Sequence, residues 1–378
     1  MKEIIALKRK WILLLIPISL FIIVLCKNFT FIAEYIFARG LYRVMAIIMG
    51  LVTRWFPFSV AEICIYLLPF IVVFLLSRFI YKAIKDRENR FMIIGKSILN
   101  ILCTISIVLF AFVVLCGTNY YRYSFTTYLD YESGTYSKED LYKLCDYLAD
   151  KLNKAREDVA VDENGVMKLS YENNRELLSK AGTVMSEFVS DYPAYKYSTG
   201  TVKPVLASKY MSYTEIVGIY VPFTMEANIN MDVPDHNHPV DALHELAHLR
   251  GVMPEDEANY VAYLACISSG EEDFIYSGYM LAFILSSNRL YDEDKELYRQ
   301  VQNKLSDGVI NDIRADITYW KKYETPTANK ISNVSNKVND TYLNLNGQTE
   351  GTKSYGMLVD LLLAEFKENE NDINKENN

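Results

Sequence analysis

The stretch HNHPVDALHELAH, residues 236–248, decides how the polar part of this chain is expected to fold. It contains all four histidines of the protein, and its last five residues follow the pattern H-E-x-x-H. On an α-helix, positions i and i+4 lie on one face, so His244 and His248 can offer two imidazole nitrogens to one metal ion. Glu245 is offset from both and can reach a water molecule on that metal without displacing a ligand. Two ligands and one general base are what zinc-dependent hydrolysis of an amide requires.

The residues around this pattern favour a helix. Pro239 suits the first turn, where its missing N–H is no loss, and Asn237 or His238 can cap it. Gly251 supplies a C-terminal stop. The sequence therefore predicts a helix of about three turns over Pro239–Arg250. The alternative is a helix whose histidines only pack or face water.

Two histidines leave a zinc ion underligated, so a third protein ligand is needed. His236 and His238 precede the helix too closely to curl back easily, whereas Glu255 and Glu257 both open the next predicted helix. Each helical residue turns by about 100°, so only one of these glutamates can face the metal. Asn259 lies one turn beyond Glu255, where its amide could hold a ligating histidine. We therefore predict Glu255 as the third ligand.

Charge divides the chain into two parts. Residues 1–117 hold 14 Lys+Arg and 5 Asp+Glu, which gives +9, and the remainder holds 25 and 42, which gives −17. A basic, apolar front and an acidic, polar back indicate a membrane anchor, 1–117, followed by a water-exposed domain, 118–366. The acidic domain lacks basic clusters, which argues against a nucleic-acid partner. Residues 367–378 are charged and are expected to be a disordered tail.

Three apolar runs are long enough, with their flanks, to cross a bilayer: about 11–27, 61–79 and 96–117. The segment 28–60 is apolar and aromatic but is interrupted by glutamate and arginine, which favours an amphipathic segment on the membrane surface. Positive charge is retained on the cytoplasmic side, so the basic loop 78–96 should be inside. Three spans then place the C-terminal domain outside the cytoplasm.

The domain is expected to be α+β and mostly helical. Apolar and polar residues alternate from Ala227 to Val233, which predicts a half-buried strand. It is either an ordinary sheet strand or a strand along the cleft that pairs with an extended peptide. Cys145 and Cys266 could pair, and the sequence leaves this open. Helical spacing is found over 138–158, 171–192, 254–268, 280–290, 292–323 and 354–366.

The H-E-x-x-H pattern followed by a glutamate on a second helix resembles the gluzincin type of metallopeptidase. The closest resemblance is to a bacterial family of membrane proteins, the domain-of-unknown-function 3810 family. It is carried by residues 221–228, 244–251, 255–259 and 276–279.

The resemblance implies a zincin-like domain that binds Zn²⁺ through His244, His248 and Glu255, with Glu245 as the general base. Peptidases of this type usually add a donor for the developing oxyanion, for which Tyr276 and Tyr279 are the candidates; both could instead only pack.

Two functions are compatible with these features. The first is a multi-pass cell-membrane protein whose extracytoplasmic domain is a zinc metallopeptidase acting on peptide or protein substrates, with the lipid bilayer as its other partner. The second is a catalytically silent, zinc-stabilised membrane protein with an envelope or signalling role. An intact Glu245 favours the enzyme, because a purely structural zinc site has no need of an acid at that position.

Overall fold

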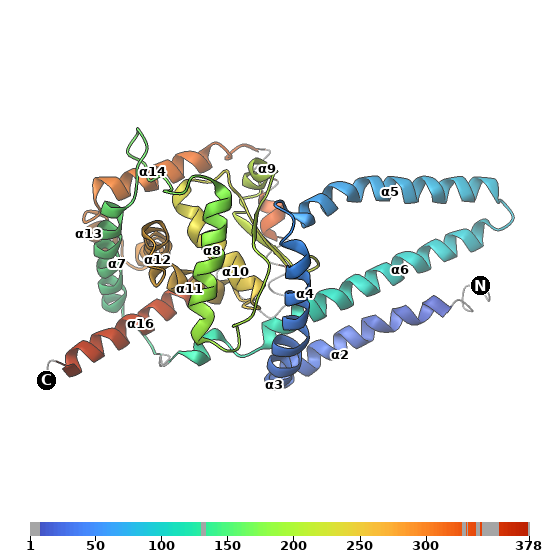
Figure 1. Cartoon of the computed structure of the whole chain (residues 1–378), viewed down its shortest axis with the longest axis horizontal. Coiled ribbons are helices and arrows are strands. Elements are labelled where there is room, and N and C mark those ends of the chain that lie inside the picture. Colours follow the sequence, from blue (N-terminus) through green and yellow to red (C-terminus); the bar gives the residue numbers. More distant parts are fainter. Residues whose placement is uncertain are drawn as a thin grey trace.

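The computed structural model of the protein describes residues 8–129, 134–326, 330, 332–337, 341 and 355–376. Long apolar helices project from one side of a mostly helical body that contains a small sheet (Figure 1). The expectation of a mostly helical chain with apolar helices at its front is confirmed. These helices indicate a membrane-anchored protein.

The three projecting helices correspond to the predicted spans. They are η1 with α2 (Lys8–Leu14 and Leu15–Asn28), α5 (Val60–Lys85) and α6 (Arg90–Leu115). A fourth helix, Thr30–Thr53, is also long and apolar enough to cross a membrane by length and composition. Figure 1 shows α2, α5 and α6 extending away from the body in the same general direction.

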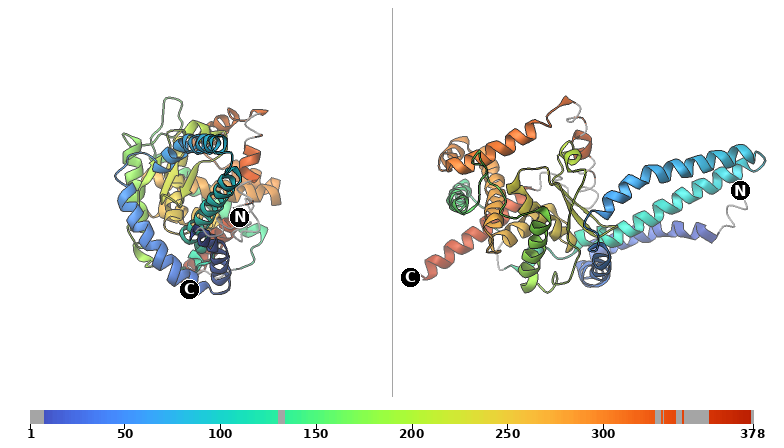
Figure 2. Two further views of the ribbon diagram at one scale, coloured as in Figure 1. Left: turned by 90° about the vertical axis from the view of Figure 1, so that its right-hand side faces the viewer. Right: turned by 45° about the horizontal axis from the view of Figure 1, so that its top comes forward.

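The helix Thr30–Thr53 lies across the body-side ends of the other three. It consists of α3 (Thr30–Ile32), the π-helix η2 (Ala33–Tyr42) and α4 (Arg43–Thr53). In the view of Figure 2 that looks along the projecting helices, α4 is seen lengthwise. The buried face of the helix Thr30–Thr53 includes Tyr42, Ala46, Gly50 and Thr53. Its exposed face carries Leu41, Val44, Ile48, Leu51 and Val52. One face of the helix therefore packs on the body with mostly small side chains, and the other exposes apolar side chains.

The sheet has three strands in the order β1-β3-β2, namely β1 (Val202–Pro204), β2 (Gly218–Val221) and β3 (Glu226–Ile229). β3 pairs in parallel with β1 and antiparallel with β2. The predicted strand is thus the central one and has no free edge for a peptide. It is also wholly buried instead of half-buried. The buried side-chain amide nitrogen of its polar Asn228 donates to the carbonyl oxygens of Ile219 and Glu226.

The helices of the body pack around α10, which carries the histidines. α10 contacts β3 on one side and α8 and α11 on others. Gly278 allows α12 to approach α11, because a β-carbon at this position would lie 2.5 Å from Cβ of Cys266. Cys266 and Cys145 are both buried free thiols. The helices are α7 (Lys138–Asp158), α8 (Asn174–Phe188), α9 (Ser208–Ser212), α10 (His238–Leu249), α11 (Glu255–Ile267), α12 (Glu272–Glu293), α13 (Lys295–Gln302), α14 (Asp307–Lys321) and α16 (Tyr355–Glu376).

The structure adds detail to two predictions for the C-terminal region. The helical region predicted over 292–323 is interrupted between α13 and α14. There the Ser306 hydroxyl caps α14 by accepting a hydrogen bond from the N–H of Val309. α16 also continues to Glu376, into the tail that was expected to be disordered. Lys367, just beyond the apolar part of α16, forms an ion pair with Asp140 of α7 and ties this extension to the body.

Candidate metal centre

The helix α10 begins one residue earlier than predicted, at His238, with Pro239 in its first turn. Asn237 precedes it without a side-chain capping bond, and its amide donates to Asp316 instead, at 2.9 Å. Gly251 has a φ of +84°, the left-handed conformation that ends helices and that glycine adopts without strain. These features fix both ends of the helix that holds H-E-x-x-H.

The two histidines of the pattern lie side by side on α10. The ring centroids of His244 and His248 are 4.6 Å apart and the rings are nearly perpendicular. Nδ1 of His244 is 2.8 Å from Oδ1 of Asn259, and Nδ1 of His248 is 2.7 Å from the carbonyl oxygen of Val252. Because carbonyl oxygens only accept, Nδ1 carries the hydrogen in both rings. Both Nε2 atoms are therefore the ring atoms that could bind a metal.

Glu255, at the start of α11, completes the cluster. Its Oε2 is 3.3 Å from Nε2 of His244, and its Oε1 is 3.6 Å from Nε2 of His248. In the described part of the chain, these three residues are the group whose ligand atoms could hold a metal ion, all lying within 4.8 Å of one another. Glu257 points elsewhere and accepts a hydrogen bond from the N–H of Phe125 at 2.7 Å. The donor set fits zinc, which takes three protein ligands in hydrolytic sites.

The electrostatics of the cluster favour a cation. Burial opposes the ionisation of Glu255, but the two histidines outweigh it and lower the pKa of the carboxyl. Burial likewise opposes the protonation of His248, yet the Glu255 carboxylate raises the pKa of this imidazole to about 9. A positive charge between the ligands is therefore stabilised, and in the metal-free chain a proton supplies it.

Glu245 lies beside the cluster, buried between α10 and β2. It is 4% exposed, and a β-carbon at Gly218 would lie 2.4 Å from its Oε1. Burial raises the pKa of Glu245 to about 8, because an uncompensated carboxylate is unfavourable away from water. A cation at the ligands would favour the ionised form. The residue is thus poised to exchange a proton near neutral pH.

A cavity of about 580 Å³ opens next to the cluster and contains Glu245 in its wall. One wall is the edge strand β2, whose other edge pairs with β3. The cavity could therefore admit an extended molecule along β2. It is lined by Phe112, Tyr120, Glu215, Ile216, Val217, Gly218, Ile219, Tyr220, Pro222, Phe223, Asp241, His244, Glu245, His248, Met253, Glu255, Asn259, Ser335 and Asn336.

The predicted oxyanion donors are not at the cavity. Tyr276 is fully buried in α12, and its hydroxyl donates to Oδ2 of Asp312 at 2.5 Å. Tyr279 packs against the ring of Tyr263. Among the described residues, the tyrosines that line the cavity are Tyr120 and Tyr220. No local sequence pattern predicts that these two tyrosines line the cavity, because they approach the cluster only through the packing of η3 (Gly117–Tyr121) and β2.

The other two histidines also lie apart from the cluster. His236 is in the short helical turn η6 (Asp235–Asn237), and its Nε2 is 3.8 Å from Asp316. His238 is buried at the start of α10, where burial lowers the pKa of its imidazole to about 4. Neither residue lines the cavity. This agrees with the sequence argument that they are too close to the helix to reach its metal-binding face.

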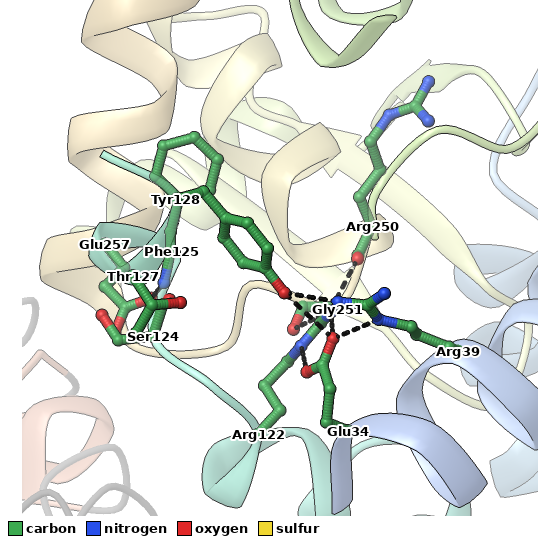
Figure 3. Close-up of polar contacts among 10 residues, drawn as sticks. All are labelled: Glu34, Arg39, Arg122, Ser124, Phe125, Thr127, Tyr128, Arg250, Gly251 and Glu257. Carbon is green, nitrogen blue, oxygen red and sulfur yellow. Dashed lines mark hydrogen bonds and ion pairs between the residues drawn. The ribbon is translucent and has the colours of Figure 1, made fainter. Parts of the chain in front are cut away.

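A buried ion pair fastens the turn between α10 and α11 to the helix Thr30–Thr53. Arg122 lies between this helix and the turn (Figure 3). Its Nε donates to Oε2 of Glu34 at 2.9 Å, and its Nη1 to the carbonyl oxygens of Arg250 and Gly251 at 3.5 and 3.4 Å. Both side chains are almost wholly buried. Breaking such a pair leaves an uncompensated charge, so the contact fixes the turn firmly.

A second contact holds the end of α10. The hydroxyl of Tyr42 donates to the carbonyl oxygens of His248 and Leu249, at 3.0 and 3.2 Å. These carbonyls belong to the last turn of the helix, which lacks intrahelical partners. The helix that carries the predicted ligands thus rests directly on the membrane-associated part of the chain.

Comparison with known proteins identifies the family but no activity. The chain matches no curated protein and no solved structure. Residues 37–363 match the family model described as "Protein of unknown function (DUF3810)". The match extends from η2 through α5, α6 and the sheet to α16 and includes the whole ligand cluster. Because it covers most of the sequence, as the resemblance predicted, the chain belongs to the DUF3810 family.

Proposed function

We propose that the protein is a membrane-anchored, zinc-dependent peptidase with a zincin-like domain. The observation that carries the proposal is the meeting of His244, His248 and Glu255, with ligand atoms within 4.8 Å of one another, beside a buried glutamate in an open cavity. A purely structural zinc site normally closes its fourth coordination position with a further ligand. Here the cluster adjoins a cavity, which favours catalysis over the silent, zinc-stabilised alternative.

The residues have separate tasks in this proposal. Bound zinc would polarise a carbonyl group and lower the pKa of a water molecule. Glu245 would act as the general base that accepts a proton from the attacking water and returns it to the leaving amine. Asn259 and the carbonyl of Val252 hold the two histidines in the tautomer that directs Nε2 to the metal. Tyr220 lines the same cavity, but its hydroxyl donates to the sulfur of Met225 at 2.8 Å and so is not directed at the reacting group.

A polypeptide suits the cavity better than a small ester or amide. β2 forms one wall, and Ile219 and Tyr220 of this strand line the cavity. An edge strand offers N–H and C=O groups to an extended peptide, which binds by adding a strand to the sheet. The peptide-binding role considered for the strand predicted over 227–233, which the structure has as β3, therefore passes to its neighbour β2.

The activity is tested on the full chain in detergent micelles or lipid vesicles, with a mixture of unstructured peptides as substrate. Hydrolysis should stop when a chelator removes the metal and should return when zinc is added back. Mass spectrometry of the products identifies the cleaved bonds. Hydrolysis that persists in the metal-free protein would contradict the proposal.

We also propose three membrane spans, with Thr30–Thr53 on the membrane surface and the domain outside the cytoplasm. The exposed apolar face of α4 and its crosswise position support the surface role. The basic turn between α5 and α6 supports the orientation, since positive charge is retained inside. Protease added to intact cells stripped of their wall should digest the domain. Protection of the domain in sealed cells would contradict this orientation.

A further inference from the structure

The wall of the cavity reaches into the membrane part of the protein. Phe112 lines the cavity and belongs to the last turn of α6, inside the candidate span Arg90–Leu115. Tyr120 lines it too and lies in η3, directly after that span. One side of the cavity is therefore built at the level where α6 leaves the bilayer.

Another part of the cavity wall is tied to the start of α5. Glu226, the first residue of β3, accepts hydrogen bonds from the N–H groups of Val60 and Ala61 at 3.1 and 2.9 Å. It thereby satisfies free donors at the N-terminus of this helix. The turn that joins β2 to Glu226 contains Pro222 and Phe223, which line the cavity. This turn is consequently held at the level where α5 enters the bilayer.

A second set of bonds secures the same corner. Glu62 of α5 accepts from the N–H groups of Leu206 and Ala207, each at 2.8 Å. The buried ammonium of Lys203 donates to the carbonyl oxygen of Thr53 at 3.0 Å. Strand β1 and the segment after it are thus fastened to the corner between α4 and α5, so the sheet and α5 keep a fixed relation.

The two membrane helices separate towards the body. α5 and α6 lie close together at the turn that connects them and diverge as they approach the sheet (Figure 1). Two apolar side chains of the cavity wall are partly exposed. Ile219 is 46% exposed and Phe223 is 45% exposed. Exposed apolar groups in a cavity wall mark a surface that binds apolar or membrane-bound partners.

We infer that the substrate is a polypeptide anchored in the same membrane and is cut in the stretch just outside the bilayer. Such a chain, leaving the lipid between α5 and α6, passes Phe112 and Phe223 before it reaches the ligand cluster and can then lie along β2. The inference rests on the proposed peptidase function and adds the substrate class to it.

The test compares one cleavable peptide in three forms, with the full chain reconstituted in vesicles. The peptide is free in solution, joined by a short spacer to an apolar transmembrane helix, or joined to that helix by a long flexible spacer. The long-spacer form controls for the raised local concentration that any tether produces. We expect the short-spacer form to be cleaved at least about tenfold faster than the long-spacer form, at a bond set by its distance from the bilayer.

The outcomes separate the inference from the function on which it rests. Equal rates for the two anchored forms, or faster cleavage of the free peptide at matched concentration, would overturn the inference and leave the peptidase intact. Failure of the zinc-loaded protein to cleave any of the three forms would overturn the peptidase proposal together with the inference.

A pair of variants provides a second readout. Phe223→Asp places a charge where the anchored chain would pass. The ratio of the cleavage rate of the short-spacer peptide to that of the free peptide should therefore fall about tenfold. Val161→Asp is the matched control, since Val161 is 49% exposed in a hairpin of the body and does not line the cavity. An unchanged ratio in Phe223→Asp would contradict the route between α5 and α6.

Discussion

The carboxylate of Glu245 lies against the backbone of Gly218, with no room for a β-carbon between them. Such a carbon would lie 2.4 Å from Oε1 and 2.8 Å from Cδ of Glu245. The contact joins the proposed general base on α10 to the edge strand β2, which forms a wall of the cavity. Gly218 thus sets the position of the carboxylate without taking part in the chemistry.

Gly218→Ala should displace Glu245 and lower the rate of hydrolysis by about 100-fold, the order of magnitude that a general base contributes. The metal content should stay unchanged, because Gly218 contacts none of the three proposed ligands. The matched control is Gly182→Ala, since a β-carbon at Gly182 in α8 meets no atom within 4 Å. Full activity in Gly218→Ala would show that the position of Glu245 does not matter.

The amide of Asn259 should determine metal affinity through His244. Asn259→Leu removes the acceptor for Nδ1 of His244, and we expect zinc to bind roughly 10- to 100-fold more weakly. Asn259→Asp keeps an oxygen acceptor and should retain most of the affinity. Competition with a chelating dye measures both variants. Equal affinities for the leucine and aspartate variants would contradict the positioning role.

Glu255 and Glu257 provide a matched pair of substitutions two positions apart on α11. Glu255→Gln should lose zinc, because the carboxylate beside both Nε2 atoms becomes a neutral amide. Glu257→Gln should keep its zinc, because this side chain accepts a hydrogen bond from Phe125 on the other side of the helix. Metal analysis of the two purified proteins decides between them, and the reverse pattern would move the ligand to Glu257.

The contact between α16 and α11 should depend on pH. Burial raises the pKa of Glu365 to about 7, although the hydrogen bond that the Tyr260 hydroxyl donates to this carboxylate acts to lower the pKa. The folded state therefore holds a proton that the unfolded chain releases near its ordinary value of 4.5. The resulting stabilisation of the folded state is complete below about pH 4.5 and is lost as the pH rises through about 7.

Glu365→Gln imitates the protonated carboxyl and should remove this dependence. Compared with the parent, the variant should be more stable by about 2 kcal/mol above the folded pKa and nearly equal in stability below the unfolded one. The comparison uses thermal unfolding of the full chain in detergent over this pH range. A constant difference between the two proteins at all pH values would exclude Glu365 as the titrating group.

Local sequence signals predicted the metal helix and the residues on its face. Pro239 and Gly251 mark its ends, and the spacing of His244 and His248 follows from the geometry of one helix. The choice of Glu255 over Glu257 needed only the rotation per residue along α11 and the position of Asn259 one turn beyond Glu255. These features depend on residues a few positions apart, so a single sequence contains the necessary information.

The features that depend on distant parts of the chain could not be predicted in this way. The hydroxyl of Tyr276 binds Asp312, thirty-six positions away, and this pairing removes Tyr276 from the candidate donors. Phe112 reaches the cavity only because α6 ends against the body. The alternation that predicted β3 did not reveal its partners, because a strand shows its neighbours only in the folded sheet.

The most direct test of the peptidase proposal is the substitution Glu245→Gln, with zinc content and peptide hydrolysis measured on the same preparation of the full chain. The account predicts that the variant binds zinc as the parent does, because its three ligands are unchanged, and that hydrolysis falls by at least about 100-fold, because the general base is lost. A variant that holds zinc and cleaves as fast as the parent would contradict the account.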